Sequence, residues 1–417
     1  MSDRRAHAFS TLRFRDFRLL WFADSVSILG TQIQRIAITW HVFELTGDPF
    51  QLGLLGLFRF VPVLVFGLLG GVIADHRDRR MVLIFTHLAL LASTGTLAAA
   101  TLAGEVSVGL IYSITFISST FNAMAGPARQ ALIPNLVPRS SLAGAATMAN
   151  LSMQAAMVAG PAIGGVIIAQ TSLALAYMLD AASFIAVIAA ALLIRTRQAR
   201  VPITERGLSA IKAGFVLLWH TPILLAVMSL DFIATFFGAI TNLMPIFAGE
   251  ILGGGANSLG LLLSAPAAGA ILGSLVFGLF TMPQKPGFGM VACVIAYGAC
   301  IVGFGLTNNI WLALLFLAGS GAADSISMAL RHAIRNLITP DAFRGRIAAA
   351  HSAFAMGGPQ LGEFRAGAMA SWMGAPAAVA IGGVGTILGT IAMVRLVPTI
   401  LRYRSTEEAP VAEAASA

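Results

Sequence analysis

Charged residues are scarce in this sequence. Asp, Glu, Lys and Arg make up 11% of its 417 residues, against about a quarter in a typical soluble domain. Hydrophobic residues make up 57%, and the mean hydropathy is +0.85. Apolar runs of about 18 residues or more recur along nearly the whole chain. Because backbone polar groups in lipid must be paired within the segment, these runs predict transmembrane helices rather than the short alternating strands of a membrane barrel.

Cysteine is nearly absent, since Cys293 and Cys300 are the only two. They lie in one apolar block and predict packing residues on a helix, not a disulfide framework. The sequence also lacks a phosphate-binding Gly-rich loop that ends in Lys-Ser or Lys-Thr, which argues against direct use of ATP. Its seven histidines have no zinc-ligand spacing. The loops are too short for a catalytic domain, so we expect no enzyme activity, no metal and no cofactor.

Twelve segments of the chain are apolar and long enough to span a bilayer. Their expected boundaries are 18–43, 51–74, 81–103, 107–127, 143–169, 173–194, 215–247, 256–280, 288–306, 310–330, 346–372 and 376–400. We therefore expect an all-α membrane protein of twelve transmembrane helices.

Basic residues are missing from every second connection between these segments. No Lys or Arg occurs in residues 44–51, 104–106, 170–172, 249–257, 307–309 and 373–375. The remaining connections and both chain ends carry Arg or Lys, and such loops stay in the cytoplasm. The net charge of +8 thus reflects topology rather than nucleic-acid binding. It predicts a multi-pass protein of the bacterial inner membrane with both termini in the cytoplasm.

This topology predicts a chain of five parts. They are an N-terminal segment (1–17), a first six-helix half (18–194), a cytoplasmic linker (195–214), a second six-helix half (215–401) and an acidic, Ala-rich tail (402–417). We expect the tail to be disordered, because it has few residues that could form a core. We expect the rest to work as a monomer in the lipid bilayer.

An internal repeat supports the division into two halves. Arg129-Gln-Ala-Leu, followed by Asn135-Leu-Val-Pro, resembles Arg331-His-Ala-Ile, followed by Asn336-Leu-Ile-Thr-Pro. Gly160-Pro-Ala-Ile-Gly and Gly358-Pro-Gln-Leu-Gly then follow at similar distances. The two junctions lie six helices apart. This spacing predicts homologous halves whose interface holds a midplane site that opens to each side in turn.

Several segments also resemble a known family. Gly70–Arg80 reads GGVIADHRDRR and resembles the conserved loop between the second and third helices of the major facilitator superfamily. Residues 44–49, 127–134, 179–184 and 345–364 are similar to its enterobactin-exporter and macrolide-efflux-like branch.

The resemblance implies a major facilitator fold and a secondary transporter. Its substrates would be siderophores, antibiotics or other amphiphilic molecules, exported by alternating access in exchange for protons. A lipid or metabolite carrier with the same fold and another mode of coupling is an alternative. A non-transporting receptor or membrane enzyme is a second one.

Two family motifs suggest moving parts. The loop motif implies a cytoplasmic gate, whose ion pairs break as the halves rock, made of Asp75, Arg77, Arg79, Arg80 and Arg129. Gly160, Pro161 and Gly164 resemble the antiporter motif of drug exporters, although Ala156 stands where that motif usually has glycine. The predicted fourth helix, residues 107–127, lacks the buried Arg of many proton-coupled relatives.

Ionisable side chains within the predicted helices are functional candidates, because each costs about 2.5–3.5 kcal/mol to insert into a membrane. As proton carrier we favour Glu363, then Asp24, with Asp231 and Asp324 behind them. Static ion pairs are the competing interpretation for each acid. We expect Arg35 or Arg59 to be balanced by Asp180 in a charge network of the first half.

Substrate contacts are harder to assign from sequence. In this family the first, fourth, seventh and tenth helices usually line the cavity. Besides Asp231, this nominates Gln32, Asn122, Met124, Asn242 and Met328. Each of them could equally pack or hydrogen-bond between helices.

Overall fold

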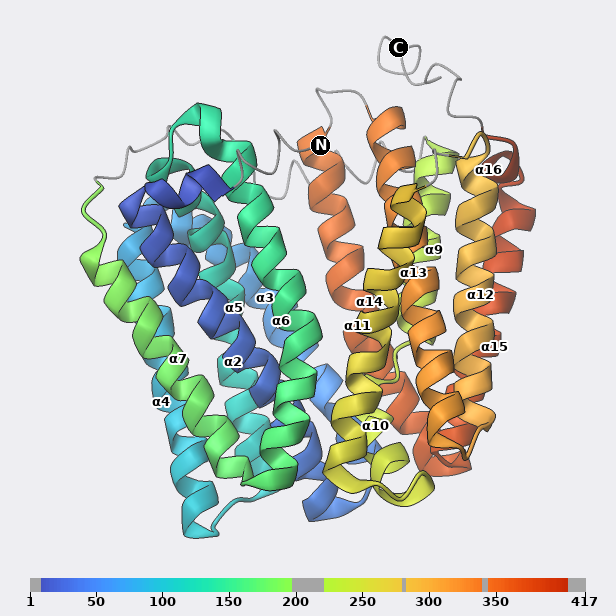
Figure 1. Ribbon diagram of the computed structural model, residues 1–417, viewed down its shortest axis with the longest axis horizontal. Coiled ribbons are helices and arrows are strands. Elements are labelled where there is room, and N and C mark those ends of the chain that lie inside the picture. The colour runs from blue at the N-terminus through green and yellow to red at the C-terminus, as the bar shows by residue number, and fades with distance from the viewer. Residues whose placement is uncertain (1–8, 197–220, 280–282, 340–343, 404–417) are drawn as a thin grey trace. The chain divides into compact units, whose positions relative to one another are not determined.

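The computed structural model describes residues 9–196, 221–279, 283–339 and 344–403, with side chains throughout except at 68–76 and 344–356. All regular structure in these ranges is helical (Figure 1). The first half contains η1 (Ser10–Arg13), α2 (Arg15–Thr46), α3 (Pro49–His76), α4 (Arg79–Ala103), α5 (Val108–Leu136), η2 (Arg139–Ser141), α6 (Leu142–Gln170) and α7 (Leu173–Leu193).

The second half contains α9 (Pro222–Phe237), η3 (Thr241–Leu243), α10 (Met244–Ile246), η4 (Phe247–Ile251), α11 (Gly255–Leu279), α12 (Pro286–Leu306), α13 (Ile310–Ile338), α14 (Arg344–Met373), α15 (Ala375–Leu396) and α16 (Thr399–Arg402). Helices α5 and α13 extend beyond the predicted ends at 127 and 330. Hydropathy falls where arginines enter the sequence, but the helices continue through them.

Ten helices among the described residues are long and apolar enough to cross a membrane. Helices α2 and α14 have 32 and 30 residues, so both are long enough as well. Both carry charged residues within their length, Asp24 and Arg35 in α2 and Glu363 and Arg365 in α14. The predicted all-α membrane fold is thus confirmed.

The seventh predicted span is interrupted, which the sequence analysis missed by treating residues 215–247 as one helix. Helix α9 ends at Phe237, and a short non-helical stretch separates it from the segment Thr241–Ile251. The segment consists of a 3-10 turn, a helical turn and a π-helical turn. Residues 215–220 lie outside the described part of the chain.

Polar and glycine residues set the helix ends where the sequence predicts turns. The side chains of Asp78, Ser107, Ser172 and Asn309 each accept a backbone N–H in the first turn of the following helix. Gly104 ends α4 in the left-handed conformation that glycine adopts at little cost.

The described residues form two compact units that are not continuous in sequence. One comprises 9–47, 58–196 and 254–261, and the other comprises 48–57, 221–253, 262–279, 283–339 and 344–403. The first turns of α3 therefore pack with the second unit, and those of α11 pack with the first. The expected segments 1–17 and 195–214 are described only in part, and 404–417 of the tail lies outside the described residues.

In the first unit, α2 packs against both α6 and α7. A Cβ on Gly30 of α2 would lie 2.8 Å from Ser183 Oγ and 2.9 Å from Asp180 Oδ1, so a larger residue would displace these side chains of α7. On the other side, Gly160 of α6 faces Gln32, and a Cβ on Gly164 would lie 3.4 Å from Ile33 Cα. The antiporter-like glycines thus let α6 lie close to α2.

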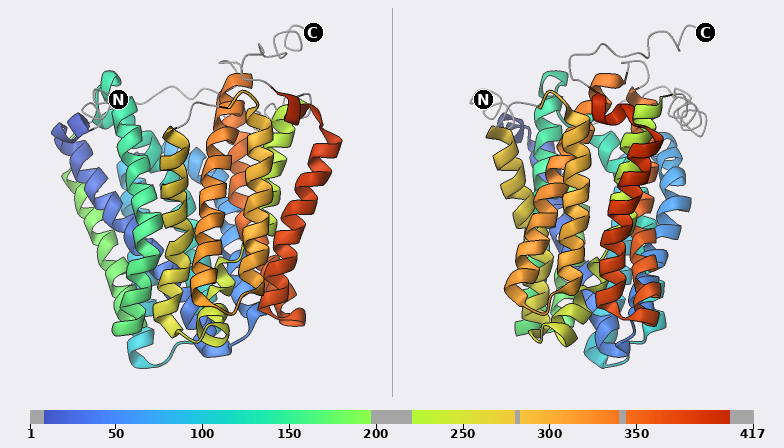
Figure 2. Two further views of the ribbon diagram at one scale, coloured as in Figure 1. Left: turned by 45° about the vertical axis from the view of Figure 1, so that its right-hand side comes forward. Right: turned by 90° about the vertical axis from the view of Figure 1, so that its right-hand side faces the viewer.

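In the second unit, α9 packs against α14 and α15, and α12 packs against α13 and α15, as Figure 2 shows from two sides. Gly358 and Gly362 of α14 face Thr235 and Phe236 of α9. They repeat the roles of Gly160 and Gly164 against α2. The predicted internal repeat is therefore present in the packing as well as in the sequence.

Candidate functional site

An ion pair joins the first and fourth spans of the first half. Arg129 Nη1 of α5 lies 2.7 Å from Asp24 Oδ1 of α2. Both side chains are largely buried, with 30% and 17% of their surface exposed. Next to them, Ser25 of α2 donates a hydrogen bond to Ser152 of α6, so polar groups of three helices meet here.

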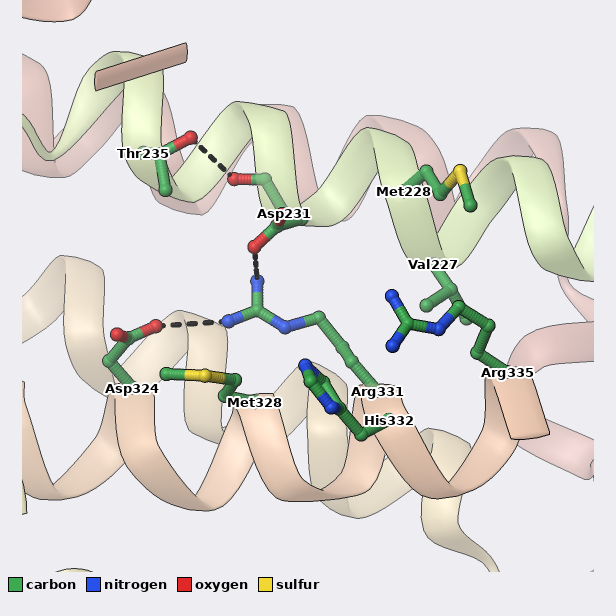
Figure 3. A pocket seen from close by; sticks show the side chains of 9 residues that line it. All are labelled: Val227, Met228, Asp231, Thr235, Asp324, Met328, Arg331, His332 and Arg335. Atoms are coloured by element: carbon green, nitrogen blue, oxygen red, sulfur yellow. Dashed lines mark hydrogen bonds and ion pairs between the residues drawn. The ribbon is translucent and has the colours of Figure 1, made fainter. Parts of the chain in front are cut away.

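The second half has a larger charge cluster at the same place in the repeat (Figure 3). Arg331 of α13 lies between two carboxylates, with Nη1 2.6 Å from Asp231 Oδ1 and Nη2 3.0 Å from Asp324 Oδ1. Arg331 is 6% exposed and Asp231 13%, whereas Asp324 is 39% exposed. One guanidinium thus serves two acids, and the more accessible acid is Asp324. We call these three residues the Arg331 triad.

The Arg331 triad borders a cavity of about 180 Å³ between α9 and α13. Helix α9 contributes Val227, Met228, Asp231 and Thr235, and α13 contributes Asp324, Met328, Arg331, His332 and Arg335. Residues 324, 328, 331 and 335 are spaced three or four apart, so they share one face of α13. The cavity therefore combines charged groups with two methionine side chains that suit an apolar ligand surface.

The two charge clusters lie at equivalent positions of the repeat. Arg129 and Arg331 open the two copies of the repeated motif, and Asp24 and Asp231 lie on the first helix of each half. In the described residues Arg129 pairs with the single acid Asp24, whereas Arg331 also binds the additional acid Asp324. Of these five residues, Asp24, Arg129, Asp231 and Asp324 were functional candidates from sequence, whereas Arg331 was noted only as part of the repeat, and the pairing was not predicted.

Glu363 and Arg365 of α14 bind the two broken ends of the seventh span. Glu363 accepts hydrogen bonds from the backbone amides of Thr241 (3.0 Å) and Asn242 (2.8 Å), at the start of the outer segment. Arg365 donates to the carbonyl of Phe237, the last residue of α9, at 2.8 Å. A carboxylate at a helical N-terminus and a cation at a C-terminus are each favourable to the helix dipole. We call this pair the helix brace.

Further contacts hold the same break. Tyr297 of α12 donates a hydrogen bond to the carbonyl of Gly238 at 3.0 Å. The amide group of Asn242, which is 2% exposed, donates to the carbonyl of Leu52 at 3.1 Å. Asn242 was nominated as a substrate contact, but it is buried and its side-chain amide binds backbone.

The expected pairing of Asp180 with Arg35 or Arg59 is wrong. Asp180 is fully buried on α7, and its carboxylate accepts a hydrogen bond from Thr31 of α2. Arg59 donates instead to the carbonyl of Arg35 at 3.5 Å. Asp180 lies where Gly30 lets α2 approach α7, so polar helix packing replaces the expected ion pair.

Two of the four predicted gate arginines contact backbone carbonyls of the first unit. Arg79 donates to Ala131 of α5 at 2.9 Å, and Arg80 donates to Leu192 at 2.8 Å and Ile194 at 3.1 Å. Arg77 is exposed. The side chain of Asp75 lies outside the described part, and Arg129 pairs with Asp24. The gate remains a prediction.

A clamp at the end of α7 was not predicted. Asp16, in the first turn of α2, accepts hydrogen bonds from the amides of Arg195 and Thr196 and from the Thr196 hydroxyl at 2.6–3.0 Å. Arg15 donates to the carbonyl of Leu193 at 3.2 Å. Asp16 and Arg15 thus bind the end of α7 just before the linker. A single acid in a basic segment carried no signal that pointed to these partners.

The clamp is expected to be sensitive to acid. Burial raises the pKa of Asp16, but hydrogen bonds from Thr196 and Arg195 and the charge of Arg15 lower this pKa by more, to below its ordinary value of 3.8. A carboxyl with a depressed pKa adds stability above its ordinary pKa and loses it as pH falls through the depressed value. Hydrogen exchange of the Arg195 and Thr196 amides should therefore be slow at pH 5–7 and accelerate below about pH 4, relative to unstructured peptides. In Asp16→Ala the exchange of these two amides should be fast at every pH. Protection equal to that of the native chain in this variant would contradict the clamp.

The remaining substrate candidates lie in different surroundings. Gln32 packs on Gly160, and Asn122 donates to the carbonyl of Ser118 on its own helix. Met124 is half-buried on α5. Of the nominated residues, Asp231 and Met328 line the cavity beside the Arg331 triad. Among the described residues, no three His, Cys, Asp or Glu side chains are grouped to hold a metal ion.

Comparison with known proteins identifies the family. The family model described as transmembrane secretion effector matches residues 6–413. The enterobactin exporter EntS of Citrobacter koseri is 25% identical over 394 residues, with 94% of each chain covered. The enterobactin exporter of Escherichia coli strain SE11 is 25% identical over 390 residues, again with 94% of each chain covered.

Solved structures show the same fold. A bacterial homologue of the human lysosomal transporter Spinster, inward-facing and unoccupied, matches with a TM-score of 0.68 at 15% identity, over 93% of this chain and 96% of that one. A POT family transporter in complex with a peptide conjugate matches with a TM-score of 0.72 at 11% identity, with coverages of 93% and 96%. A bacterial homologue of ferroportin gives 0.69 at 15% identity, with coverages of 91% and 98%.

These matches agree with the repeated helical halves and confirm the predicted superfamily. They also confirm that the chain is not an enzyme, because the family and the matched relatives are transporters. The chain belongs to the transmembrane secretion effector family of the major facilitator superfamily, and it is a multi-pass membrane transporter.

Proposed function

We propose that this transporter exports small amphiphilic molecules across the bacterial inner membrane in exchange for protons. Twelve spanning helices with both termini in the cytoplasm fit the sorting of arginines among the loops. The relatives at 25% identity are enterobactin exporters, so a siderophore is the first substrate to test. The observation that carries the proposal is the Arg331 triad beside a cavity that also presents Met228 and Met328.

Proton coupling is assigned to the Arg331 triad. One guanidinium offsets one of the two carboxylates, so binding one proton makes the triad neutral. Asp324 is the acid that exchanges this proton, because it is 39% exposed and Asp231 is 13% exposed. Alternating access requires that this proton bind from one side of the membrane and be released to the other. Glu363 is a weaker candidate than sequence suggested, because its carboxylate binds two backbone amides.

The proposal is tested by an export screen in cells that lack their own efflux pumps. Cells that express the native chain should retain less of a siderophore, macrolide or other amphiphilic compound than cells with an empty vector. Collapsing the proton gradient should remove the difference. Export that persists without a gradient would favour a carrier with another mode of coupling. Absence of export for every compound would refute the proposed substrate class.

A further inference from the structure

We infer that the cavity binds the acidic group of its substrate through Arg335, so that the substrates are organic anions with an apolar body. This inference rests on the proposed function and deepens it. It names the chemical class of the cargo and the residue that recognises it.

Arg335 presents a guanidinium with unused hydrogen-bonding capacity. Among the described residues it makes no side-chain hydrogen bond and no ion pair, although it feels the charge of Asp231. Arg331, by contrast, is occupied by two carboxylates. Five N–H donors in a planar fork match a carboxylate, sulfonate or phosphate group in two-point geometry. Arg335 is therefore the cavity's available anion-binding group.

The direction of the side chain supports this role. In Figure 3 the guanidinium of Arg335 points back along α13, toward Arg331 and His332, over the cavity. Arg335 also lies in the last turn of α13, where any cation complements the helix dipole. Complementing the helix dipole would not by itself require the guanidinium of Arg335 to line a cavity.

The surrounding side chains suit the rest of an amphiphilic molecule. Met228, Met328 and Val227 line the same cavity as Arg335 and His332. The volume of about 180 Å³ is smaller than the roughly 300–1,000 Å³ of most ligand pockets. It therefore holds an acidic group with an adjoining ring or alkyl chain rather than a large substrate in full.

The anion site and the proton site are separate. Arg335 follows Asp324 by eleven positions on one helix, which is about 16 Å at 1.5 Å per residue. Asp324 and Arg335 are the first and last of the α13 residues that line the cavity, so an anion at Arg335 is offset along the helix from Asp324. The two sites are coupled through the alternation of the transporter and not through direct competition.

A pair of matched probes tests the inference without any transport. Naphthalene-1-sulfonate carries a charge, and naphthalene-1-sulfonamide has the same skeleton without one. We expect the purified full-length native chain to bind the sulfonate at least about tenfold more tightly by calorimetry, since a hydrogen bond to a charged group contributes about 1.5–3 kcal/mol. The preference should shrink as salt rises, because salt screens partly exposed charges.

Two variants assign this preference to Arg335. Arg335→Gln should bind both probes equally, and Arg335→Lys should keep part of the preference, with thermal unfolding showing that both variants fold. A native chain with no preference for the sulfonate, including one that binds neither probe, would overturn the inference. So would a full preference in Arg335→Gln. The binding measurement needs no proton gradient. A failure of anion binding at Arg335 can therefore be told apart from a failure of export.

Discussion

Arg331→Gln is expected to abolish gradient-driven export and to destabilise the protein. The substitution leaves Asp231 and Asp324 without their shared cation inside the helical bundle. Removing one partner of a buried ion pair costs about 3–5 kcal/mol, because the remaining charge is uncompensated. The thermal unfolding midpoint in detergent should fall clearly, and the export rate should fall by about 100-fold or more.

A triple variant separates the two effects. In Arg331→Gln with Asp231→Asn and Asp324→Asn, no uncompensated charge remains, and replacement of a whole buried ion cluster is often neutral for stability. The unfolding midpoint should therefore recover most of its loss while gradient-driven export stays absent. Arg331→Lys should keep the charge but not the two-point geometry, and should export only partly. Full export in the triple variant would show that the triad is structural and carries no coupling.

Loss of Glu363 is expected to loosen the break in the seventh span. Glu363→Ala leaves the amides of Thr241 and Asn242 without this acceptor, and an unsatisfied buried N–H, such as that of Asn242, costs about 1–3 kcal/mol. Hydrogen exchange at these two amides should accelerate by at least about tenfold, and the thermal unfolding midpoint should fall.

Glu363→Gln distinguishes the helix brace from a proton carrier. A carboxamide offers one acceptor oxygen where the carboxylate offers two, so this variant should be destabilised by about half as much as Glu363→Ala. Export should be slower but still driven by the proton gradient, because the proton is assigned to Asp324. Arg365→Gln is the matched control at the other end of the break, where the carbonyl of Phe237 loses its donor. If Glu363→Gln lost proton coupling while hydrogen exchange of the Thr241 and Asn242 amides stayed unchanged, Glu363 would be the proton carrier instead of Asp324.

The sequence predicted the helices well, because length and apolarity are local properties. The repeated Arg-Gln-Ala-Leu and Arg-His-Ala-Ile motifs also predicted two related halves, and the Asp24–Arg129 and Asp231–Arg331 pairs lie at equivalent places of this repeat. The break after Phe237 was missed because residues 238–247 are as apolar as a continuous span. Gly238, Thr241-Asn242 and Pro245 were the available signals, since glycine and proline weaken a helix and Thr-Asn favours a turn.

Pairing between helices was the part that sequence did not predict. Asp180 and Arg59 lie at similar depth in their helices, but depth alone does not specify which faces meet. Gly30 brings α2 against Asp180, and Thr31 of α2 donates a hydrogen bond to it there. Glu363 and Arg365 are two positions apart on α14 and so point in different directions. Their true partners are backbone groups of a broken helix, and these have no signature in the side-chain sequence.

The central claim is that a proton bound at Asp324 drives export. The most direct measurement reconstitutes the full chain in proteoliposomes with a compound identified by the export screen, and follows both compound and proton movement across an imposed pH gradient. The native chain should accumulate the compound only when the pH gradient is present. Addition of the compound should cause protons to move across the membrane in the opposite direction. Asp324→Asn should exchange the compound across the membrane but neither accumulate it nor move protons. Gradient-driven accumulation at the native level in Asp324→Asn would contradict the account.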